Sequence, residues 1–310
     1  MLGFAIMANN AKVAIQGGLG NQLFQWFFAH EYAFEKKFKI YPIFPTAPKI
    51  SPVRCAEIQP LIDRCNHIQF SQNNKMGAAF ENLVPKIFDR LWELTFLSLI
   101  LNRLGYYRED PRRDTRSHAQ RPRRLRYAAG YFMNWKIPNR HIESVKEELL
   151  PVLDEIFYRL GEKFDLHQPY TVVHVRRYEA TTNQDPRTTM ASLADQFYED
   201  WLQKHPYQRL IILTEKRSSI ESLISKTQPF LVFDQNNSSA WETLAIMSHA
   251  SSILGSNSTL SWWGVWTSHL RGASIYYPSS YDITEARFDD QDLLFPGCTP
   301  VMPIWCKPNL

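Results

Sequence analysis

The second half of the chain alternates short apolar runs with helix-like stretches, and this alternation constrains the fold more than any other feature. We expect strands at 170–175, 209–213, 230–233, 252–254 and 273–277. Helices are expected between them, at about 190–204, 217–226, 239–249 and 259–270. Short apolar strands that alternate with helices form a parallel sheet covered on both faces. The second half therefore predicts a Rossmann-like α/β domain.

The first half opens with the same order of strand, turn and helix. Residues 12–15 predict a strand, Gly17-Gly18-Leu19-Gly20 a tight turn, and Asn21 the beginning of a helix with one apolar face. A further strand is expected at 38–43. With 310 residues, 44% of them apolar, the chain suits one large or two modest domains and excludes a disordered protein. We expect domains at 1–165 and 166–285, followed by a C-terminal tail at 286–310.

Charge, cysteines and hydropathy narrow the class of protein only slightly. The net charge of +4 fits a phosphate-bearing ligand, but it also fits proteins that bind no anion. Four cysteines lack zinc-ligand spacing and suggest free cytosolic thiols: Cys55, Cys65, Cys298 and Cys306. The best apolar run, 94–101, is far shorter than the roughly 18 residues of a membrane span. The mildly apolar start, 1–15, runs into a motif and is not expected to be a signal peptide. We expect a cytoplasmic protein, soluble or peripheral at the inner membrane.

An arginine-rich segment, 103–126, holds nine arginines. Arginine at this density suits an anionic membrane surface, an acidic glycan or nucleic acid, and it equally suits a solvated loop. The apolar and aromatic stretch before it favours peripheral membrane contact over the other ligands.

Glycines between the first strand and its helix form the first of three candidate binding motifs. Gly17-Gly18-Leu19-Gly20 lets the backbone approach a ligand, and Asn21 and Gln22 add polar groups at the positive end of a helix. The same residues also fit a tight turn followed by a helix cap.

The second motif, His174-Val175-Arg176-Arg177, lies at the carboxyl end of the strand expected at 170–175. Open parallel sheets bind ligands at that end. Alternation along a strand sends His174 and Arg176 to one side and Arg177 to the other. An arginine there can bind a diphosphate with two hydrogen bonds, although a structural ion pair is the alternative.

The third motif, Ser256-Asn257-Ser258-Thr259-Leu260-Ser261-Trp262-Trp263-Gly264, follows the strand expected at 252–254 and begins a helix. Hydroxyls and an amide at a helix N-terminus suit an anion. Trp262 and Trp263 fall inside that helix, where core packing is the simpler prediction.

These three strings in this order resemble the bacterial α-1,2-fucosyltransferase family, glycosyltransferase family eleven. The resemblance runs from about 13 to 277 and implies a GT-B fold, with two facing Rossmann-like domains. It also implies a GDP-fucose donor held mainly by the second domain, and inversion at the fucose anomeric carbon without a metal cofactor. The family suggests a galactose-terminated glycan as acceptor, fucosylated on the 2-hydroxyl, and no nucleic-acid partner.

The resemblance carries residue roles onto matching positions. Arg176, with His174 and Arg177 beside it, would hold the diphosphate. Three further donor ligands come from the late motif: Asn257, Ser258 and Thr259. From the first domain, three residues would close over the cleft: Gly18, Asn21 and Gln22.

The sequence also departs from the family pattern. The family continues the arginine pair with Gly-Asp-Tyr, whereas this chain has Tyr178-Glu179-Ala180. The acidic residue after the next strand is Glu215, and the guanine contact falls on Glu242 or its neighbour Thr243. Glu179 and Asp185 are the nearest candidates for a general base, which a poorly nucleophilic hydroxyl needs. Glu179 also suits an ion pair with an arginine.

A formal metal motif, Asp290-Gln291-Asp292, lies beyond the last expected strand and is interpreted as a solvated turn. Three hypotheses remain in all. The chain is an active fucosyltransferase, an inactive homologue that binds a nucleotide sugar, or a protein that binds nucleic acid or membranes through 103–126. The last hypothesis leaves the three motifs unexplained.

Overall fold

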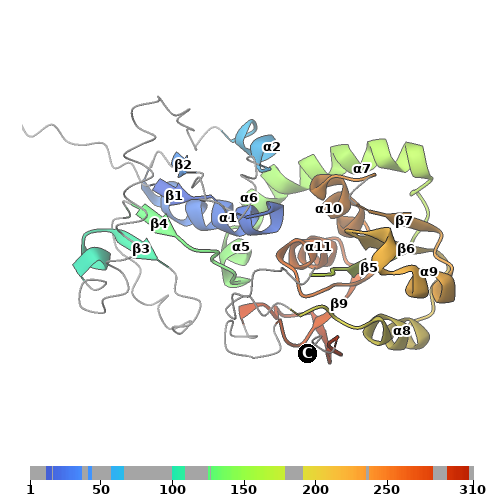
Figure 1. Cartoon of the computed structure of the whole chain (residues 1–310). Helices are drawn as coiled ribbons and strands as arrows, with labels where there is room; N and C mark the ends of the chain where they lie inside the picture. The colour runs from blue at the N-terminus through green and yellow to red at the C-terminus, as the bar shows by residue number, and fades with distance from the viewer. Residues whose placement is uncertain are drawn as a thin grey trace, which may run out of the picture. The chain divides into compact units, whose positions relative to one another are not determined.

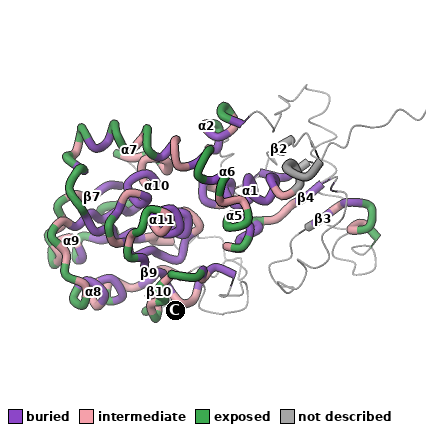
Figure 2. The backbone as a smooth tube through the Cα atoms, turned by 180° about the vertical axis from the view of Figure 1, so that it is seen from behind, coloured by how far each residue is buried: buried purple, intermediate pink, exposed green. Residues whose placement is uncertain are grey.

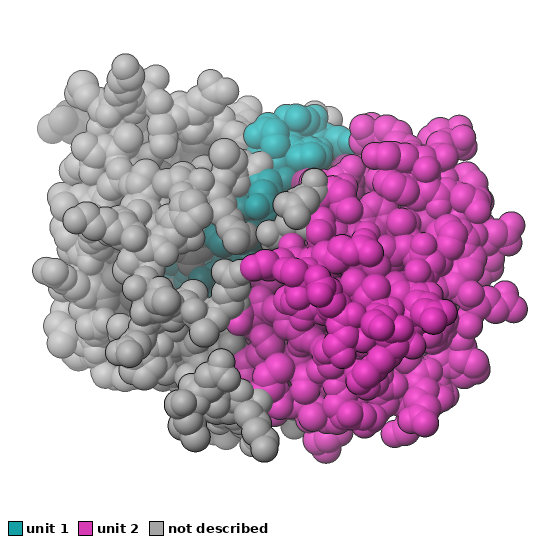
Figure 3. All heavy atoms as spheres, turned by 45° about the vertical axis from the view of Figure 1, so that its right-hand side comes forward, with its two compact units in different colours: residues 1–148 teal, residues 149–310 magenta. Residues whose placement is uncertain are grey.

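The computed structural model describes residues 12–15, 17–36, 41–43, 57–65, 100–108, 125, 127–178, 191–234, 237–281 and 292–306. The chain divides into two compact units, residues 1–148 and 149–310 (Figure 3). The sequence placed the domain boundary later, at 165. The long helix α7 (Leu150–Phe164) packs against α10 (Ala240–Ser248) of the second unit, which explains the difference.

The first unit is built on a parallel sheet of four strands in the order β2-β1-β4-β3. Its strands are β1 (Lys12–Ala14), β2 (Tyr41–Ile43), β3 (Tyr106–Arg108) and β4 (Tyr127–Ala129). Each neighbouring pair is parallel. The sequence predicted β1 and β2 but not β3 and β4. β3 lies within the arginine-rich segment, of which 109–124 and Arg126 fall outside the described residues.

The helix α1 (Leu19–Lys36) is buried on every face between Leu23 and Ala29, whereas the sequence predicted one apolar face. Phe28 stacks on Phe132, with ring centroids 3.7 Å apart. Short helices complete the described part of this unit: α2 (Gln59–Ile62), α5 (Lys136–Arg140), α6 (Ile142–Ser144) and the π-helical turn η2 (Val145–Leu149). The predicted amphipathic segment at 83–94 lies outside the described residues.

The second unit holds a parallel sheet of six strands in the order β10-β9-β8-β5-β6-β7 (Figure 1). Its strands are β5 (Thr171–Val175), β6 (Leu210–Thr214), β7 (Leu231–Phe233), β8 (Ser252–Leu254), β9 (Ser274–Pro278) and β10 (Thr299–Val301). The five strands expected in this half are confirmed, as is the α/β class.

Helices connect the strands of this sheet and cover it. They are α7, α8 (Asp195–Lys204), the 3₁₀ turn η3 (Arg217–Ser219), α9 (Glu221–Thr227), α10 and α11 (Thr259–Leu270). Val173 and Val175 face α8 and α9, in a core cluster that includes Phe197 and Leu223. α10 and α11 pack against each other, and both are largely buried (Figure 2). Strand alternation therefore turns His174 away from α8 and α9.

The C-terminal residues 292–306 belong to the second unit. β10 pairs with β9, and the indole N–H of Trp262 donates to the carbonyl of Leu293 at 2.7 Å. Asp292 is only 7% exposed, so the prediction of a solvated turn is wrong for this residue. Asp292 is buried where the chain that follows it, Leu293 and Phe295, packs on Trp262 of α11. Asp290 and Gln291 lie outside the described residues.

Two predictions about the whole chain concern membranes and thiols. Within the described ranges, no helix is both long and apolar enough to span a membrane. Cys65, Cys298 and Cys306 are not in disulfide bonds, as expected, and Cys55 lies outside the described residues.

Candidate functional site

The site predicted in the second unit lies where the strand order reverses. From β5 the chain proceeds to β6 and β7 on one side, whereas β8, β9 and β10 continue on the other. The loops after the adjacent strands β5 and β8 therefore leave in opposite directions. Open parallel sheets bind ligands in the crevice outside the carboxyl ends of such a pair. The arginine motif follows β5 and the SNST motif follows β8, so both flank this point.

His174, near the end of β5, links the two loops. Its Nδ1 lies 3.3 Å from the hydroxyl oxygen of Ser256, the second residue after β8. The imidazole is only 4% exposed. Burial, and then the charge of Arg176, lower its pKa from 6.5 to about 3. At neutral pH His174 is therefore an uncharged hydrogen-bonding group and not a cation.

Arg176 lies at the carboxyl edge and forms an ion pair with Glu215. The strand register explains this contact, because Val175 is opposite Thr214 and the next residue of each strand is charged. The guanidinium also lies 5.1 Å from the centre of the Tyr178 ring. The Arg176 side chain is 30% exposed, which leaves its guanidinium accessible to a ligand in solution.

Arg177 lies on the opposite side of the strand end and contacts residues at the beginning of α8. Its guanidinium pairs with Asp195 and donates to the carbonyl of Leu193, and it lies 5.7 Å from the centre of the Tyr198 ring. These contacts attach the end of β5 to the beginning of α8. Both arginines therefore pair with a carboxylate, the alternative that the sequence left open, and Arg177 is the less exposed of the two.

The turn after β8 is shaped by its own hydroxyls. The N–H of Ser256 donates to the Ser261 hydroxyl at 2.7 Å. Ser258 is the N-cap of α11, and its hydroxyl accepts from the N–H of Ser261 at 3.1 Å. Thr259, the first residue of the helix, is partly exposed. The local sequence therefore forms the N-terminus of a twelve-residue helix at the sheet edge.

Asn257 is fully buried in this turn and carries an unsatisfied oxygen. Its Nδ2 donates to the carbonyls of Ala191 and Tyr281, at 2.9 and 3.3 Å, and its backbone oxygen accepts from the Tyr178 hydroxyl at 2.6 Å. Its Oδ1 makes no hydrogen bond within the part of the chain that the structure describes. Buried polar atoms are satisfied in most proteins, so this oxygen suits a donor supplied by a ligand.

Glycines allow close packing beneath the turn. A Cβ on Gly255 would lie 2.7 Å from the Tyr277 ring, and one on Gly264 would lie 2.7 Å from the Cβ of Met247. Gly264 thus lets α11 approach α10. Trp262 and Trp263 have no exposed surface, which confirms their prediction as core residues.

Glu242, in the helix that follows β7, has a structural role as part of a helix cap. Glu242 lies in the first turn of α10 and forms a capping box with Ser239: its carboxylate accepts from the Ser239 N–H, and the Ser239 hydroxyl accepts from the Glu242 N–H. The sequence left the guanine contact open between Glu242 and Thr243. The Ser-x-x-Glu spacing from Ser239 to Glu242, which is typical of this cap, was missed.

The glycine motif of the first unit forms a tight turn tied by side chains. Gly17 has a φ of +80°, and a Cβ there would lie 2.5 Å from Nδ2 of Asn21. Gln22 is buried; its amide donates to the Gly17 carbonyl at 2.9 Å and accepts from the Ile58 N–H at 3.3 Å. Gly18 and Asn21 remain partly exposed. Gln22 is therefore a structural residue of the turn.

Several predicted residues come together at one place, and others do not. His174 contacts the SNST turn through Ser256. Arg176 lies beside Tyr178, whose hydroxyl donates to the backbone oxygen of Asn257. Arg177 faces α8. Glu179 and Asp185 lie outside the described residues. The sequence missed the contribution of Tyr178, whose position directly after the arginine pair was the only available signal.

Comparison of the sequence with protein-family models and with curated proteins finds no match. Solved structures are similar. The NodZ alpha-1,6-fucosyltransferase soaked with GDP-fucose has a TM-score of 0.50 at 10% identity, over 82% of this chain and 91% of that chain. A mutant of Arabidopsis thaliana FUT1 in complex with GDP scores 0.47 at 11% identity, over 88% and 72%. Escherichia coli ADP-heptose LPS heptosyltransferase II scores 0.45 at 9% identity, over 91% and 88%.

The likeness to NodZ concerns the fold alone. Together with the two parallel sheets, it confirms the predicted GT-B class, an α/β fold with two Rossmann-like domains.

Proposed function

We propose that the protein is an inverting glycosyltransferase that moves L-fucose from GDP-β-L-fucose to the 2-hydroxyl of a terminal galactose in a glycan. The observation that carries this proposal is that Arg176 follows β5 while the N-terminus of α11 follows the adjacent strand β8, at the strand reversal of the second unit. A cation and a helix N-terminus at this edge suit the diphosphate of a nucleotide sugar. The structural relatives named above include proteins solved with GDP or GDP-fucose, which supports the same donor.

In this proposal Arg176 binds the diphosphate. Its guanidinium has five N–H donors, so it can keep Glu215 on one side and bind phosphate oxygens on the other. Glu215 then orients the guanidinium before the donor arrives. Thr259 presents its backbone N–H, at the N-terminus of α11, to the same phosphates. Ser258, whose own N–H donates to the Ser256 carbonyl at 2.8 Å, contributes its hydroxyl.

His174 and Asn257 shape the donor site without adding charge. Neutral His174 holds the Ser256 side of the turn in place. The Oδ1 of Asn257, which has no hydrogen-bond partner among the described residues, accepts a hydrogen bond from GDP-fucose. Glu242 is proposed as the guanine contact, since a carboxylate can accept from the two N–H groups on one edge of guanine while it caps α10.

The chemistry follows from this arrangement. The acceptor hydroxyl attacks the anomeric carbon of fucose, and the bond from that carbon to the phosphate oxygen breaks on the opposite face. The electron pair of the broken bond stays with GDP, where Arg176 and the end of α11 stabilise the added charge. The hydroxyl proton passes to a carboxylate in the loop after Tyr178, for which we propose Glu179 or Asp185. No added Mg²⁺ or Mn²⁺ is required.

The acceptor assignment rests on the resemblance of the three motifs to α-1,2-fucosyltransferases. Release of GDP from GDP-fucose, measured with and without β-galactosides, tests it together with the donor. We expect release of GDP that depends on the acceptor. In Arg176→Ala the rate of release should fall by at least about 100-fold, because loss of one hydrogen-bond donor that stabilises transition-state charge usually costs that much. Linkage analysis of the product then identifies the substituted hydroxyl.

The matched control is Arg209→Ala. Arg209 also approaches a carboxylate, that of Asp165 at 3.5 Å, but it directly precedes β6 and so lies at the amino edge of the same sheet. Turnover close to wild type is expected in this variant.

A catalytically inactive homologue is the second candidate, supported by the changed residues Tyr178-Glu179-Ala180 after the arginine pair. It would bind GDP and release none from GDP-fucose with any β-galactoside. Failure to bind GDP would contradict both candidates.

A further inference from the structure

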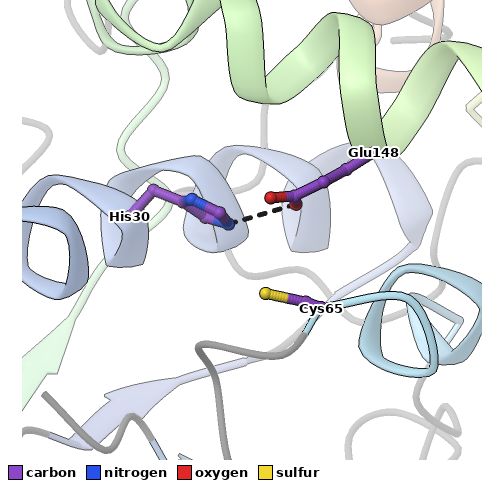
Figure 4. A group of neighbouring side chains, drawn as sticks. All are labelled: His30, Cys65 and Glu148. Atoms are coloured by element: carbon purple, nitrogen blue, oxygen red, sulfur yellow. Dashed lines mark ion pairs between the residues drawn. The ribbon is translucent and has the colours of Figure 1, made fainter. Parts of the chain in front are cut away.

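Three side chains that can bind a metal meet in the first unit, although they are far apart in the sequence. His30 comes from α1, Cys65 from the turn after α2, and Glu148 from η2. They offer one nitrogen, one sulfur and one oxygen atom, all within 4.8 Å of one another, and Figure 4 shows the three side chains pointing toward a common centre. His30 and Cys65 are buried, and the Glu148 side chain is 16% exposed.

The distances suit ligands of one ion. Nε2 of His30 lies 3.2 Å from Oε2 of Glu148. Two atoms bound to a tetrahedral zinc at about 2.0–2.1 Å lie about 3.4 Å apart. The same Nε2 is buried and makes no hydrogen bond to any described residue. Although it lies close to the Glu148 carboxylate, the angle between them does not suit an N–H···O hydrogen bond. An ion between the two groups would satisfy both.

The carboxylate is held in place by groups around it. The indole N–H of Trp26 donates to Oε2 of Glu148 at 3.1 Å. Such hydrogen bonds to a ligand carboxylate are common around metal sites. Glu148 also lies in a π-helical turn, a rare conformation that occurs often at functional sites.

We propose that His30, Cys65 and Glu148 bind one Zn²⁺ ion, with water as the fourth ligand. A set of one imidazole, one thiolate and one carboxylate matches the borderline character of zinc. Mg²⁺ and Ca²⁺ prefer oxygen alone, and Cu(I) prefers sulfur. On binding, the Cys65 thiol gives its proton to solvent and sulfur bonds to zinc as thiolate.

The ion would have a structural role that is separate from the proposed fucosyl transfer. It would join α1, the end of α2 and η2, which otherwise depend on short elements for their mutual position. Binding to the folded state alone raises stability, so zinc is expected to raise the melting temperature of the full chain.

Cobalt spectroscopy on the purified full-length chain tests the proposal. After metal removal, addition of Co²⁺ should give a thiolate-to-cobalt charge-transfer band in the near ultraviolet that saturates at one equivalent. The band should be lost in Cys65→Ser and kept in Cys298→Ser, a control whose thiol is partly buried and not in a disulfide bond. Zinc affinity should fall in Cys65→Ser by at least about 100-fold, because even outer partners of a metal site are worth about 10–100-fold.

Two results would overturn the proposal. One is a folded wild-type chain that shows no thiolate band and retains no stoichiometric zinc, which would leave an ordinary buried His–Glu pair beside a thiol. The other is a band that persists in Cys65→Ser. If Cys65→Ser fails to fold, Glu148→Gln provides the second variant: the thiolate band should remain, while zinc affinity falls. Unchanged affinity in Glu148→Gln would contradict the site.

Discussion

At the scale of single residues, two neighbouring arginines at the end of β5 have different surroundings. Arg176 contacts Glu215 and remains accessible, whereas Arg177 is buried more deeply against Asp195 and Leu193. The strand places successive side chains on opposite faces, so identical residues meet different partners. The first is suited to a ligand and the second to the attachment of α8.

The pKa of His174 leads to a prediction about stability. Its folded-state pKa, about 3, is below the unfolded value of 6.5, so between these values the unfolded chain binds a proton that the folded chain does not. The free energy of unfolding should therefore fall as pH drops below 6.5, by up to about 1.4 kcal/mol per pH unit from this group. Urea unfolding at pH 7 and pH 5 measures the slope.

Replacement of His174 by asparagine should reduce that slope, since asparagine does not titrate. Equal slopes in wild type and His174→Asn would contradict the buried, neutral imidazole.

The sequence identified much of the candidate site at this scale, because motifs that follow apolar strands mark the carboxyl edge of a parallel sheet. It did not reveal which side chains serve the fold. The cap by Glu242 is local, and the Ser-x-x-Glu spacing could have revealed it. The ion pair of Arg177 with Asp195 and the hydrogen bond of Gln22 with Ile58 depend on partners that only folding brings near. Likewise, no spacing rule links His30, Cys65 and Glu148.

At the scale of elements, α11 rests against α10 through a glycine. A Cβ on Gly264 would come within 2.7 Å of the Cβ of Met247, and that atom cannot rotate away. Gly264→Ala should therefore destabilise the chain by about 1–3 kcal/mol, the usual cost of overpacking. Thermal or urea unfolding checks this result.

Gly161→Ala is the matched control in helix α7. There a Cβ would meet only the ring of His167 at 3.0 Å, a half-exposed side chain that can move. Alanine is favoured over glycine in a helix by about 1 kcal/mol, so this variant should be neutral or more stable. Destabilisation of the two variants to the same extent would show that the contact with α10 is not the cause.

Five strands of the second sheet, β5 to β9, were predictable because they are short, apolar and separated by helices. β3, β4 and β10 were missed for physical reasons. β3 carries Arg108 within an arginine-rich segment, and β10 contains Pro300 at the edge of its sheet, where a missing N–H is tolerated. Local sequence does not indicate a strand in such places; pairing with a neighbour creates it.

At the scale of the whole molecule, each unit has its own parallel sheet, and the chain's last described residues complete the second one. Removal of 292–310 should expose Trp262, whose indole loses the Leu293 carbonyl and the Phe295 ring. The loss of these contacts should lower the melting temperature and weaken GDP binding, because Trp262 belongs to α11. Removal of 307–310 alone should change neither property.

The most direct test of the proposed donor site is the affinity for GDP, measured by calorimetry on wild type, Arg176→Ala and Arg209→Ala. We predict one site per chain in wild type, about 10–100-fold weaker binding in Arg176→Ala, since a hydrogen bond to a charged group is worth about 1.5–3 kcal/mol, and wild-type affinity in Arg209→Ala. Equal affinity in wild type and Arg176→Ala would contradict the assignment of the diphosphate to the carboxyl edge between β5 and β8.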